Sequence, residues 1–227
     1  MMGSSVKYTG NTGLVVAVEM FAVFEGWGQP DEIYDGLPFK LCRYDRYGRR
    51  IFVARSGPGQ ENAEAAARML TESFGVSELW NFGVVGGLTP EARVGDIFVV
   101  DEVVRWDGCG SGADGAAAAG REVSGREPLD AGTGALQFKR ARLASGDSVV
   151  SARGARVRLA ADTGADIVDM EAAGIAAAAA AGGHSCFMVK CVSDGLDTDE
   201  ELLTADFCET ARAAFAAFDC ILRNYAV

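Results

Sequence analysis

Short apolar runs alternate with helical segments along this chain, and this alternation constrains the possible folds more than any other feature. The runs that predict strands cover residues 14–18, 39–44, 50–55, 78–82, 96–104, 140–144, 167–170 and 186–192. The segments that predict helices cover residues 62–74, 152–163, 172–181 and 200–224. Because strands and helices alternate, we expect one α/β domain over residues 1–227 with a mainly parallel sheet.

Composition and charge exclude several classes of protein. Apolar residues make up 49% of the 227 residues, as in a globular protein with a buried sheet. The net charge is −11 and no stripe of Lys and Arg is present, so we expect no nucleic-acid partner. No apolar run reaches the length of a membrane span, so we expect no membrane contact and a cytoplasmic location. The six cysteines form no CxxC pair and there is one histidine, so we expect no zinc site.

Three glycine-rich segments follow predicted strands, at residues 56–59, 83–87 and 145–147. Glycine lets backbone amides approach a ligand closely, and a helix N-terminus adds positive potential. The first two segments match neither a Walker loop nor G-x-G-x-x-G, so we expect neither a nucleoside triphosphate nor a dinucleotide. Alternatively, each segment is only a tight turn between a strand and a helix. Residues 107–135 lack a periodic apolar pattern and predict a long loop.

Two acidic clusters stand where apolar runs end. Met170 and Glu171 precede an alanine-rich helix, and Asp194 follows the apolar run at residues 186–192. Ligands of open α/β sheets lie beyond the carboxyl ends of the strands, so we expect Glu171 and Asp194 to face one small molecule. An apolar setting can raise the pKa of a carboxyl enough for it to donate a proton near neutral pH. Alternatively, each acid only caps a helix or interacts with its dipole.

The motifs around these acids resemble those of a known family. Residues 81–102, NFGVVGGLTPEARVGDIFVVDE, are similar to the central segment of the nucleoside phosphorylase and nucleosidase superfamily, and residues 56–59 are similar to its earlier glycine turn. The motifs at residues 145–147, 168–173 and 192–194 follow in the family's order. The resemblance spans nearly the whole chain and is greatest to the methylthioadenosine/S-adenosylhomocysteine nucleosidases. It implies a three-layer α/β/α fold with a mixed central sheet.

The resemblance implies a role for each of four residues. Asp194 would hydrogen-bond N7 of a purine and protonate the leaving base, and Ser193 would help to hold this aspartate. Glu171 would bind the 2′- and 3′-hydroxyls of the ribose, and Met170 would lie beneath the sugar. Positive charge develops on the ribosyl ring when the N-glycosidic bond breaks, so both acids would lower the barrier.

Five further residues are placed at the substrate by the resemblance. Val149 and Val150 would line the base, where the nucleosidases usually offer a stacking phenylalanine. Val84, Val85 and Gly86 belong to the glycine-rich segment that would lie beside the bound nucleoside.

The nucleophile side of the site departs from the family. Nucleosidases carry, shortly after the first strand, a glutamate that activates the attacking water, and Phe21 stands at that position here, so Phe21 would lie at the substrate. Glu19 lies two residues away and would point to another face of a helix, although a bulge or register shift would bring it in. Relatives that bind phosphate have an arginine in place of Asn81 and a Ser or Thr in place of Val84, which cannot donate a hydrogen bond.

These residues lead to three functional hypotheses. The first is hydrolysis of a purine nucleoside that is methylthioadenosine-like or adenosine/inosine-like. The second is a nucleoside phosphorylase that gathers its phosphate ligands elsewhere, and the third, favoured by Phe21, is a nucleoside-binding module without turnover. For an enzyme we expect a small-molecule nucleoside as ligand, no metal and no cofactor, with inorganic phosphate needed only by a phosphorylase. We also expect a homodimer or a higher homo-oligomer.

Overall fold

The structure, a computed structural model, describes residues 10–17, 21–106, 121–123, 138–196 and 207–224. Its strands are β1 (Asn11–Val16), β2 (Glu32–Tyr34), β3 (Lys40–Arg46), β4 (Arg49–Arg55), β5 (Glu78–Gly87), β6 (Ile97–Arg105), β7 (Arg121–Val123), β8 (Lys139–Ser145), β9 (Ile167–Asp169) and β10 (Ser185–Asp194). Its helices are the 3-10 helix η1 (Phe21–Trp27) and the α-helices α1 (Gln60–Phe74), α2 (Arg153–Thr163), α3 (Ala172–Gly182) and α4 (Phe207–Asn224).

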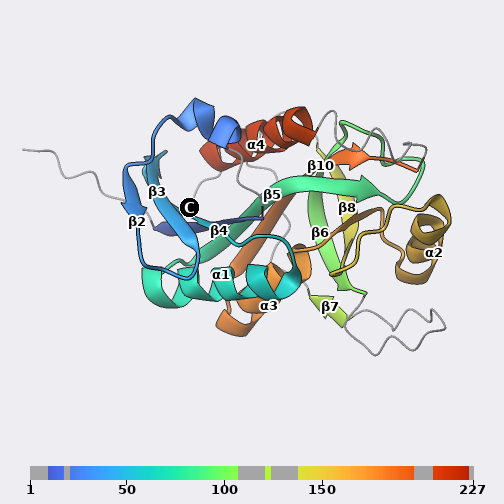
Figure 1. The fold of residues 1–227 in the computed structure, drawn as a ribbon, viewed down its shortest axis with the longest axis horizontal. Coiled ribbons are helices and arrows are strands. Elements are labelled where there is room, and N and C mark those ends of the chain that lie inside the picture. The colour runs from blue at the N-terminus through green and yellow to red at the C-terminus, as the bar shows by residue number, and fades with distance from the viewer. Residues whose placement is uncertain (1–9, 18–20, 107–120, 124–137, 197–206, 225–227) are drawn as a thin grey trace, which may run out of the picture.

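Helices cover both faces of the sheet, with η1 and α4 above it and α1 and α3 below it in Figure 1. The buried positions of α1, such as Ala63, Ala66 and Leu70, recur every three or four residues, so one stripe of the helix faces the sheet. On the opposite face, α4 packs on the sheet through an apolar cluster that includes Trp80 and Phe218. The predicted three-layer α/β/α architecture is confirmed.

The sheet is mixed. The pairs β1–β4, β1–β5, β5–β10, β6–β8 and β8–β9 are parallel, and the pairs β2–β3, β3–β4, β5–β9, β6–β7 and β6–β10 are antiparallel. The expectation of a mainly parallel sheet is therefore wrong, because β9 runs against β5 and β6 runs against β10. The pairings from β5 through β10, β6, β8 and β9 return to β5, so these strands close a ring.

The glycine-rich segment at residues 83–87 is the end of β5 and not a loop, which corrects the expectation from the sequence. Gly86 and Gly87 pair with the antiparallel strand β9. A Cβ atom at Gly87 would lie 2.5 Å from the carbonyl oxygen of Ala92, so a larger residue does not fit there. Glycine inside this strand thus marks a close approach of two backbone segments.

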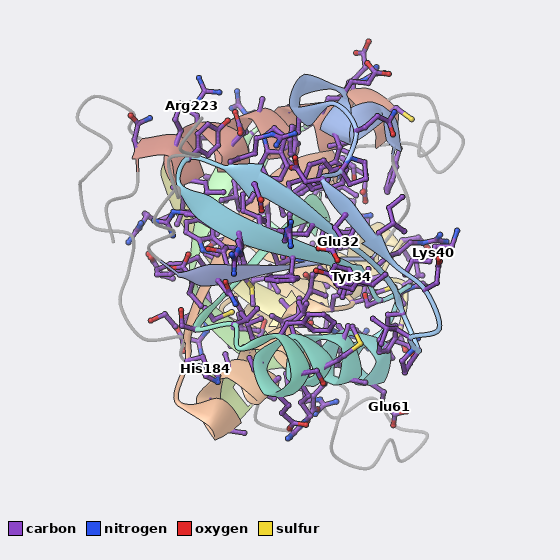
Figure 2. All side chains as sticks on the ribbon, turned by 90° about the vertical axis from the view of Figure 1, so that its left-hand side faces the viewer. Glu32, Tyr34, Lys40, Glu61, His184 and Arg223 are labelled. Carbon is purple, nitrogen blue, oxygen red and sulfur yellow. The ribbon has the colours of Figure 1, made fainter. Side chains whose placement is uncertain are left out.

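The predicted pair of strands joined by a turn is the hairpin β3–β4. Tyr47 and Gly48 have φ angles of 55° and 70°, as a two-residue hairpin turn requires. The sequence pattern does not indicate β2, which adds an outer strand to this hairpin. Figure 2 shows β2, β3 and β4 at the front of the molecule, with Glu32 and Tyr34 on β2 and with α1 below these strands.

Within the expected loop at residues 107–135 the structure describes one short strand, β7, which pairs with β6. The other residues of that segment lie outside the described residues. None of the helices in the described ranges is long and apolar enough to span a bilayer. The same ranges hold no group of three His, Cys, Asp or Glu side chains that could bind a metal ion.

Candidate functional site

A cavity of about 330 Å³ lies where β5, β9 and β10 come together. This volume is within the range of small-molecule sites. Its wall also includes the segment between β8 and α2 and the first residue of α4. The residues that line it include Phe24, Asn81, Phe82, Val84, Val85, Gly86, Val149, Val150, Arg156, Asp169, Met170, Glu171, Lys190, Ser193, Asp194 and Phe207.

Glu171 and Asp194 reach this cavity from two sides of Gly86. In the sheet, Gly86 pairs with Asp194 of β10 on one side and with Val168 of β9 on the other. β10 runs parallel to β5 whereas β9 runs antiparallel to it. The expected cause of their proximity, one edge of an open parallel sheet, is therefore wrong, because the closed ring of strands brings the two acids to one cavity.

A β-bulge directs the end of β10 into the cavity. The register with β5 shifts between Val192 and Asp194, so Ser193 is an extra residue in β10. Bulges bend a strand and re-aim its side chains. Both Ser193 and Asp194 line the cavity, and Ser193 Oγ donates a hydrogen bond to Asp194 Oδ1 over 2.6 Å.

The second carboxylate oxygen of Asp194 is paired with a buried guanidinium. Arg156 of α2 is 4% exposed, and its Nη2 forms an ion pair with Asp194 Oδ2. Its Nη1 donates to the carbonyl oxygens of Asp194 and Gly195 over 3.1 Å each and of Gly87 over 3.3 Å, and its Nε donates to Val150 O over 2.9 Å. Because Arg156 itself lines the cavity, the ion pair keeps Asp194 in the cavity wall.

Glu171 stands at the junction between β9 and α3, where it is the N-cap residue of the helix. Its Oε1 accepts a hydrogen bond from the backbone N–H of Gly59 over 3.1 Å. Burial, and next the negative charge of Asp169, raise the pKa of Glu171 to about 7 against an ordinary value of 4.5, while Lys190 acts in the opposite direction. A carboxyl with this pKa is present in both protonation states near neutral pH.

A second buried ion pair lies in the same wall. Lys190 Nζ donates to Asp169 Oδ2 over 2.7 Å, and the two side chains are 1% and 2% exposed. Asp169 Oδ1 accepts hydrogen bonds from the backbone N–H groups of Glu171 and Ala172, so this carboxylate also caps α3. Asn81 lines the cavity as well, and its buried Oδ1 has no hydrogen-bond partner in the protein, which leaves an acceptor for a ligand.

The backbone amides at the N-terminus of α1 are bonded to protein carboxylates. Gly59 N–H donates to Glu171, and Gln60 N–H donates to Asp147 Oδ1 over 2.8 Å. Gly59 has a φ angle of 100°, which L-residues with side chains rarely adopt. The glycine turns at residues 56–59 and 145–147 therefore make contacts between protein groups.

Six other residues expected in the site also line the cavity. They are Met170, Val149, Val150, Val84, Val85 and Gly86. Glu19 lies outside the described residues, and so does the side chain of Phe21, where η1 begins. The identity of a water-activating group therefore stays a prediction.

Arg156 and Lys190 are lining residues that the family motifs do not indicate. Arg156 shares the buried face of α2 with Leu159 and Thr163, at spacings of three and seven residues. Lys190 interrupts the apolar run of β10. Charged residues are rarely buried without a partner, so a charge within an apolar stripe is a signal that could have found both residues.

Comparison with known proteins identifies one family. The family model described as "Phosphorylase superfamily" matches residues 35–225 of the chain. A 5′-methylthioadenosine/S-adenosylhomocysteine nucleosidase from Marinomonas sp. (strain MWYL1) is 32% identical over 98 residues, which are 42% of each chain. The nucleosidase of the same name from Mycobacterium bovis is 40% identical over 58 residues, 26% of this chain and 23% of its own. The chain thus matches less than half the length of these curated relatives.

Solved structures are similar over almost the whole chain. A futalosine hydrolase mutant of Helicobacter pylori strain 26695 has a TM-score of 0.85 at 20% identity, covering 96% of this chain and 100% of its own. The 5′-methylthioadenosine/S-adenosyl homocysteine nucleosidase of Helicobacter pylori, in complex with a pyrrolopyrimidine compound, has a TM-score of 0.85 at 19% identity and the same coverage. At such identities these structures establish the fold.

Proposed function

Because this chain belongs to the phosphorylase superfamily, we propose that it is a hydrolase that cleaves the N-glycosidic bond of a purine nucleoside, with Asp194 protonating the leaving base. The observation that carries the proposal is that Asp194 and Glu171, from separate strand ends, line one cavity of about 330 Å³. The nucleosidase names of the curated relatives support a nucleoside substrate of the methylthioadenosine type.

Asp194 forms the base end of the proposed site. When the N-glycosidic bond breaks, its electron pair stays with the purine, and a proton on N7 neutralises the developing negative charge. The carboxyl of Asp194 would supply that proton, while the hydroxyl of Ser193 holds one of its oxygens over 2.6 Å. General acid catalysis of this type contributes a factor of about 10²–10⁴ to the rate.

Glu171 forms the sugar end. In its ionised form it would accept hydrogen bonds from the ribose hydroxyls and stabilise the positive charge that develops on the ring. Gly59 holds one of its oxygens, and the Lys190–Asp169 pair beside it contributes no net charge. Positive charge on the sugar and negative charge on the base would then each meet a complementary group.

Water is favoured over phosphate as the nucleophile. Val84 in the cavity wall has no side-chain donor for a phosphate oxygen. The first amides of α1, which would bind an anion well, are already bonded to Glu171 and Asp147. An enzyme with these features would release the base without phosphate.

The aromatic side of the cavity favours a nucleoside with an apolar substituent. Phe24 and Phe82 line this side with their ring centroids 5.8 Å apart, and Phe207 also lines the cavity. Apolar groups gain free energy when they leave water for such a wall. A methylthio group at the 5′ position would match it better than a free hydroxyl.

The test is to incubate the protein with methylthioadenosine, adenosine or inosine, with and without inorganic phosphate, and to measure free base. We expect release from methylthioadenosine at the same rate in both buffers, and release that requires phosphate would contradict hydrolysis. Binding without release from any nucleoside would contradict an enzymatic role. The homo-oligomeric state, independence of cofactors and the cytoplasmic location stay predictions from the sequence.

A further inference from the structure

Arg156 joins four separate parts of the site. Its five hydrogen bonds link α2 to the side chain and carbonyl oxygen of Asp194 and to the carbonyl oxygens of Gly195, Gly87 and Val150. Its side chain is 4% exposed, so these bonds replace almost all of its hydration. An arginine with so many bonds at one carboxylate fixes both the position and the charge of its surroundings.

Both oxygens of the Asp194 carboxylate are held by neighbouring side chains. Ser193 Oγ donates to Oδ1 over 2.6 Å, and Arg156 Nη2 is paired with Oδ2. A Cβ atom at Gly86 would lie 3.3 Å from Oδ2, so the carboxylate also lies close to the backbone of β5. The group expected to donate the proton therefore has little freedom to turn.

We propose that Arg156 is a positioning residue that stabilises the carboxylate formed when Asp194 gives its proton to the leaving base. This inference rests on the proposed function and adds a residue to it. In the step, the N-glycosidic bond breaks, its electron pair remains on the purine, and N7 takes the proton of the Asp194 carboxyl. The new carboxylate charge faces the Arg156 guanidinium. Water adds its hydroxyl to C1 of the sugar and releases a proton to solvent, from which Asp194 is protonated again.

The guanidinium acts on the charge that Asp194 acquires during the step. It is paired with Oδ2, so it stabilises the carboxylate that forms as the proton leaves for the base. Removal of the positive charge should therefore lower kcat more than it changes KM. A purely structural role for Arg156 predicts the same loss for a charged and for a neutral replacement.

The other charged groups of the cavity are the same in every variant of the test. Glu171 faces the cavity from the start of α3, and the Lys190–Asp169 pair faces it from β10 and β9. Differences in kcat between the Arg156 variants then report on the guanidinium.

The experiment compares Arg156→Gln, which is neutral, with Arg156→Lys, which keeps the charge. For Arg156→Gln we expect kcat to fall at least tenfold while KM changes by less than about threefold, because the charge is needed as the proton moves. For Arg156→Lys we expect a smaller fall in kcat, since a lysine keeps the charge although it makes fewer of the bonds. Equal losses of kcat in the two variants, or a loss in Arg156→Gln that lies in KM, would overturn the proposal.

Arg49→Gln is the matched control. Arg49 is also 4% exposed and is paired with a carboxylate, Glu78, over 2.6 Å, but neither residue lines the cavity. We expect this variant to lose stability and keep the kcat of the wild type. A fall in kcat as large as in Arg156→Gln would contradict a specific role for Arg156.

A measurement without turnover separates this inference from the proposed function. The ¹³C carboxyl signal of Asp194, assigned with Asp194→Asn, can be recorded at one pH in the unliganded wild type, in Arg156→Gln and in Arg49→Gln. We expect its chemical shift to change in Arg156→Gln, where the carboxylate loses its partner, and to stay as in the wild type in Arg49→Gln. An unchanged signal in Arg156→Gln would overturn the role of Arg156. If the wild type releases no base, the proposed function fails, whereas this spectrum still tests the contact between Arg156 and Asp194.

Discussion

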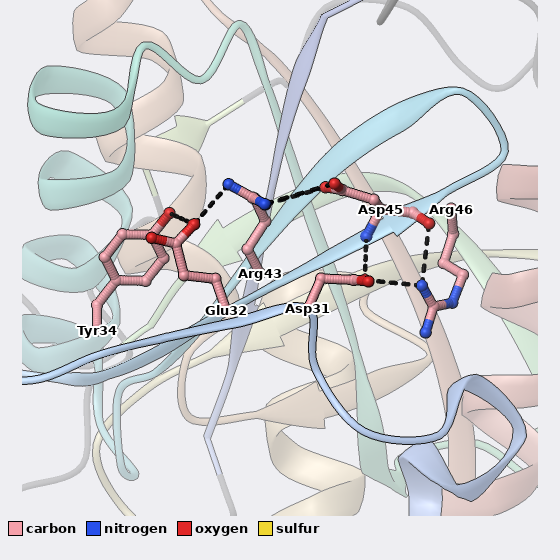
Figure 3. A network of polar contacts seen from close by, with 6 residues as sticks. All are labelled: Asp31, Glu32, Tyr34, Arg43, Asp45 and Arg46. Carbon is pink, nitrogen blue, oxygen red and sulfur yellow. Dashed lines mark hydrogen bonds and ion pairs between the residues drawn. The ribbon is translucent and has the colours of Figure 1, made fainter. Parts of the chain in front are cut away.

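Two polar networks of this chain pair carboxylates with cationic side chains, one exposed to solvent and the other buried. The first lies on the outer strands β2 and β3 and the segment before them, and it is drawn in Figure 3 with Asp31, Glu32, Tyr34, Arg43, Asp45 and Arg46. Its Arg43–Glu32 pair has a distance of 2.6 Å and side chains 23% and 44% exposed. The second lies in the cavity wall, where Lys190 and Asp169 are 2.7 Å apart and only 1% and 2% exposed.

The two ion pairs differ in their exposure to solvent and hardly in their distance. Water and salt screen the exposed pair, so its attraction only slightly exceeds the cost of ordering two long side chains. The buried pair has lost its hydration, and either partner left alone would be an uncompensated charge in an apolar environment. We therefore expect the loss of one ion-pair partner to lower the stability of the protein strongly in the cavity wall and only slightly on the outer strands.

The largest effect is expected from Lys190→Met. This change leaves the Asp169 carboxylate buried without its cation, and we expect the free energy of unfolding to fall by about 3–5 kcal/mol. Urea unfolding followed by circular dichroism measures it. The double variant Lys190→Met/Asp169→Asn should recover part of the loss, because asparagine keeps the acceptor that caps α3. A loss as small as that of an exposed pair would contradict the comparison.

The next effect concerns catalysis. Asp194→Asn removes the proton donor and keeps the shape of the side chain, so we expect base release to fall at least a hundredfold. Steady-state measurement of free base gives the ratio, and thermal unfolding verifies that the fold is intact. Near-normal turnover in the variant would remove Asp194 from the acid role.

A smaller effect with a distinct pH dependence is expected from Glu171→Gln. The pKa of Glu171 is raised to about 7 in the folded protein, so the stability that it contributes is complete below about pH 4.5 and is lost as the pH rises through 7. Glutamine stays neutral and can still accept the hydrogen bond of Gly59. We expect the free energy of unfolding of the variant to be higher than that of the wild type by roughly 1–3 kcal/mol at pH 9 and equal to it at pH 4. An equal difference at both pH values, measured by urea unfolding, would contradict the raised pKa.

The smallest effect is expected on the outer strands. Arg43→Gln breaks the exposed pair with Glu32, and we expect a loss below about 1 kcal/mol that shrinks further as salt is added. The same urea measurement at low and high salt tests it. A loss comparable to that of Lys190→Met would show that exposure does not distinguish the two networks.

The fold could be predicted where the signal is local. Continuous β-branched and aromatic runs indicated β5, β6 and β10, and helical spacing indicated α1. The direction of β9 could not be predicted. The strand has only three residues, and their sequence does not indicate that they pair with β5 or in which direction they run. The glycines at the end of β5 resembled a loop, although they belong to the strand. Gly87 is a glycine because the backbone of Ala92 leaves no room for a Cβ atom there.

In the candidate site, too, local motifs could be predicted and long-range pairings could not. Motifs indicated Glu171, Ser193 and Asp194, and these residues line the cavity, while their roles stay predictions. The partners of the acids could not be read from motifs, since Arg156 and Asp194 are 38 residues apart and Lys190 and Asp169 are 21 apart. Pairings over such separations depend on the closed ring of strands, which is a property of the whole fold.

The most direct test of the proposed hydrolysis is a phosphate-free reaction with methylthioadenosine in H₂¹⁸O, followed by mass spectrometry of the sugar product. If Asp194 and Glu171 cleave the bond for attack by water, free adenine appears together with a sugar that carries one ¹⁸O atom at C1. Adenine release that stops without phosphate, or a sugar without the label, would contradict the account.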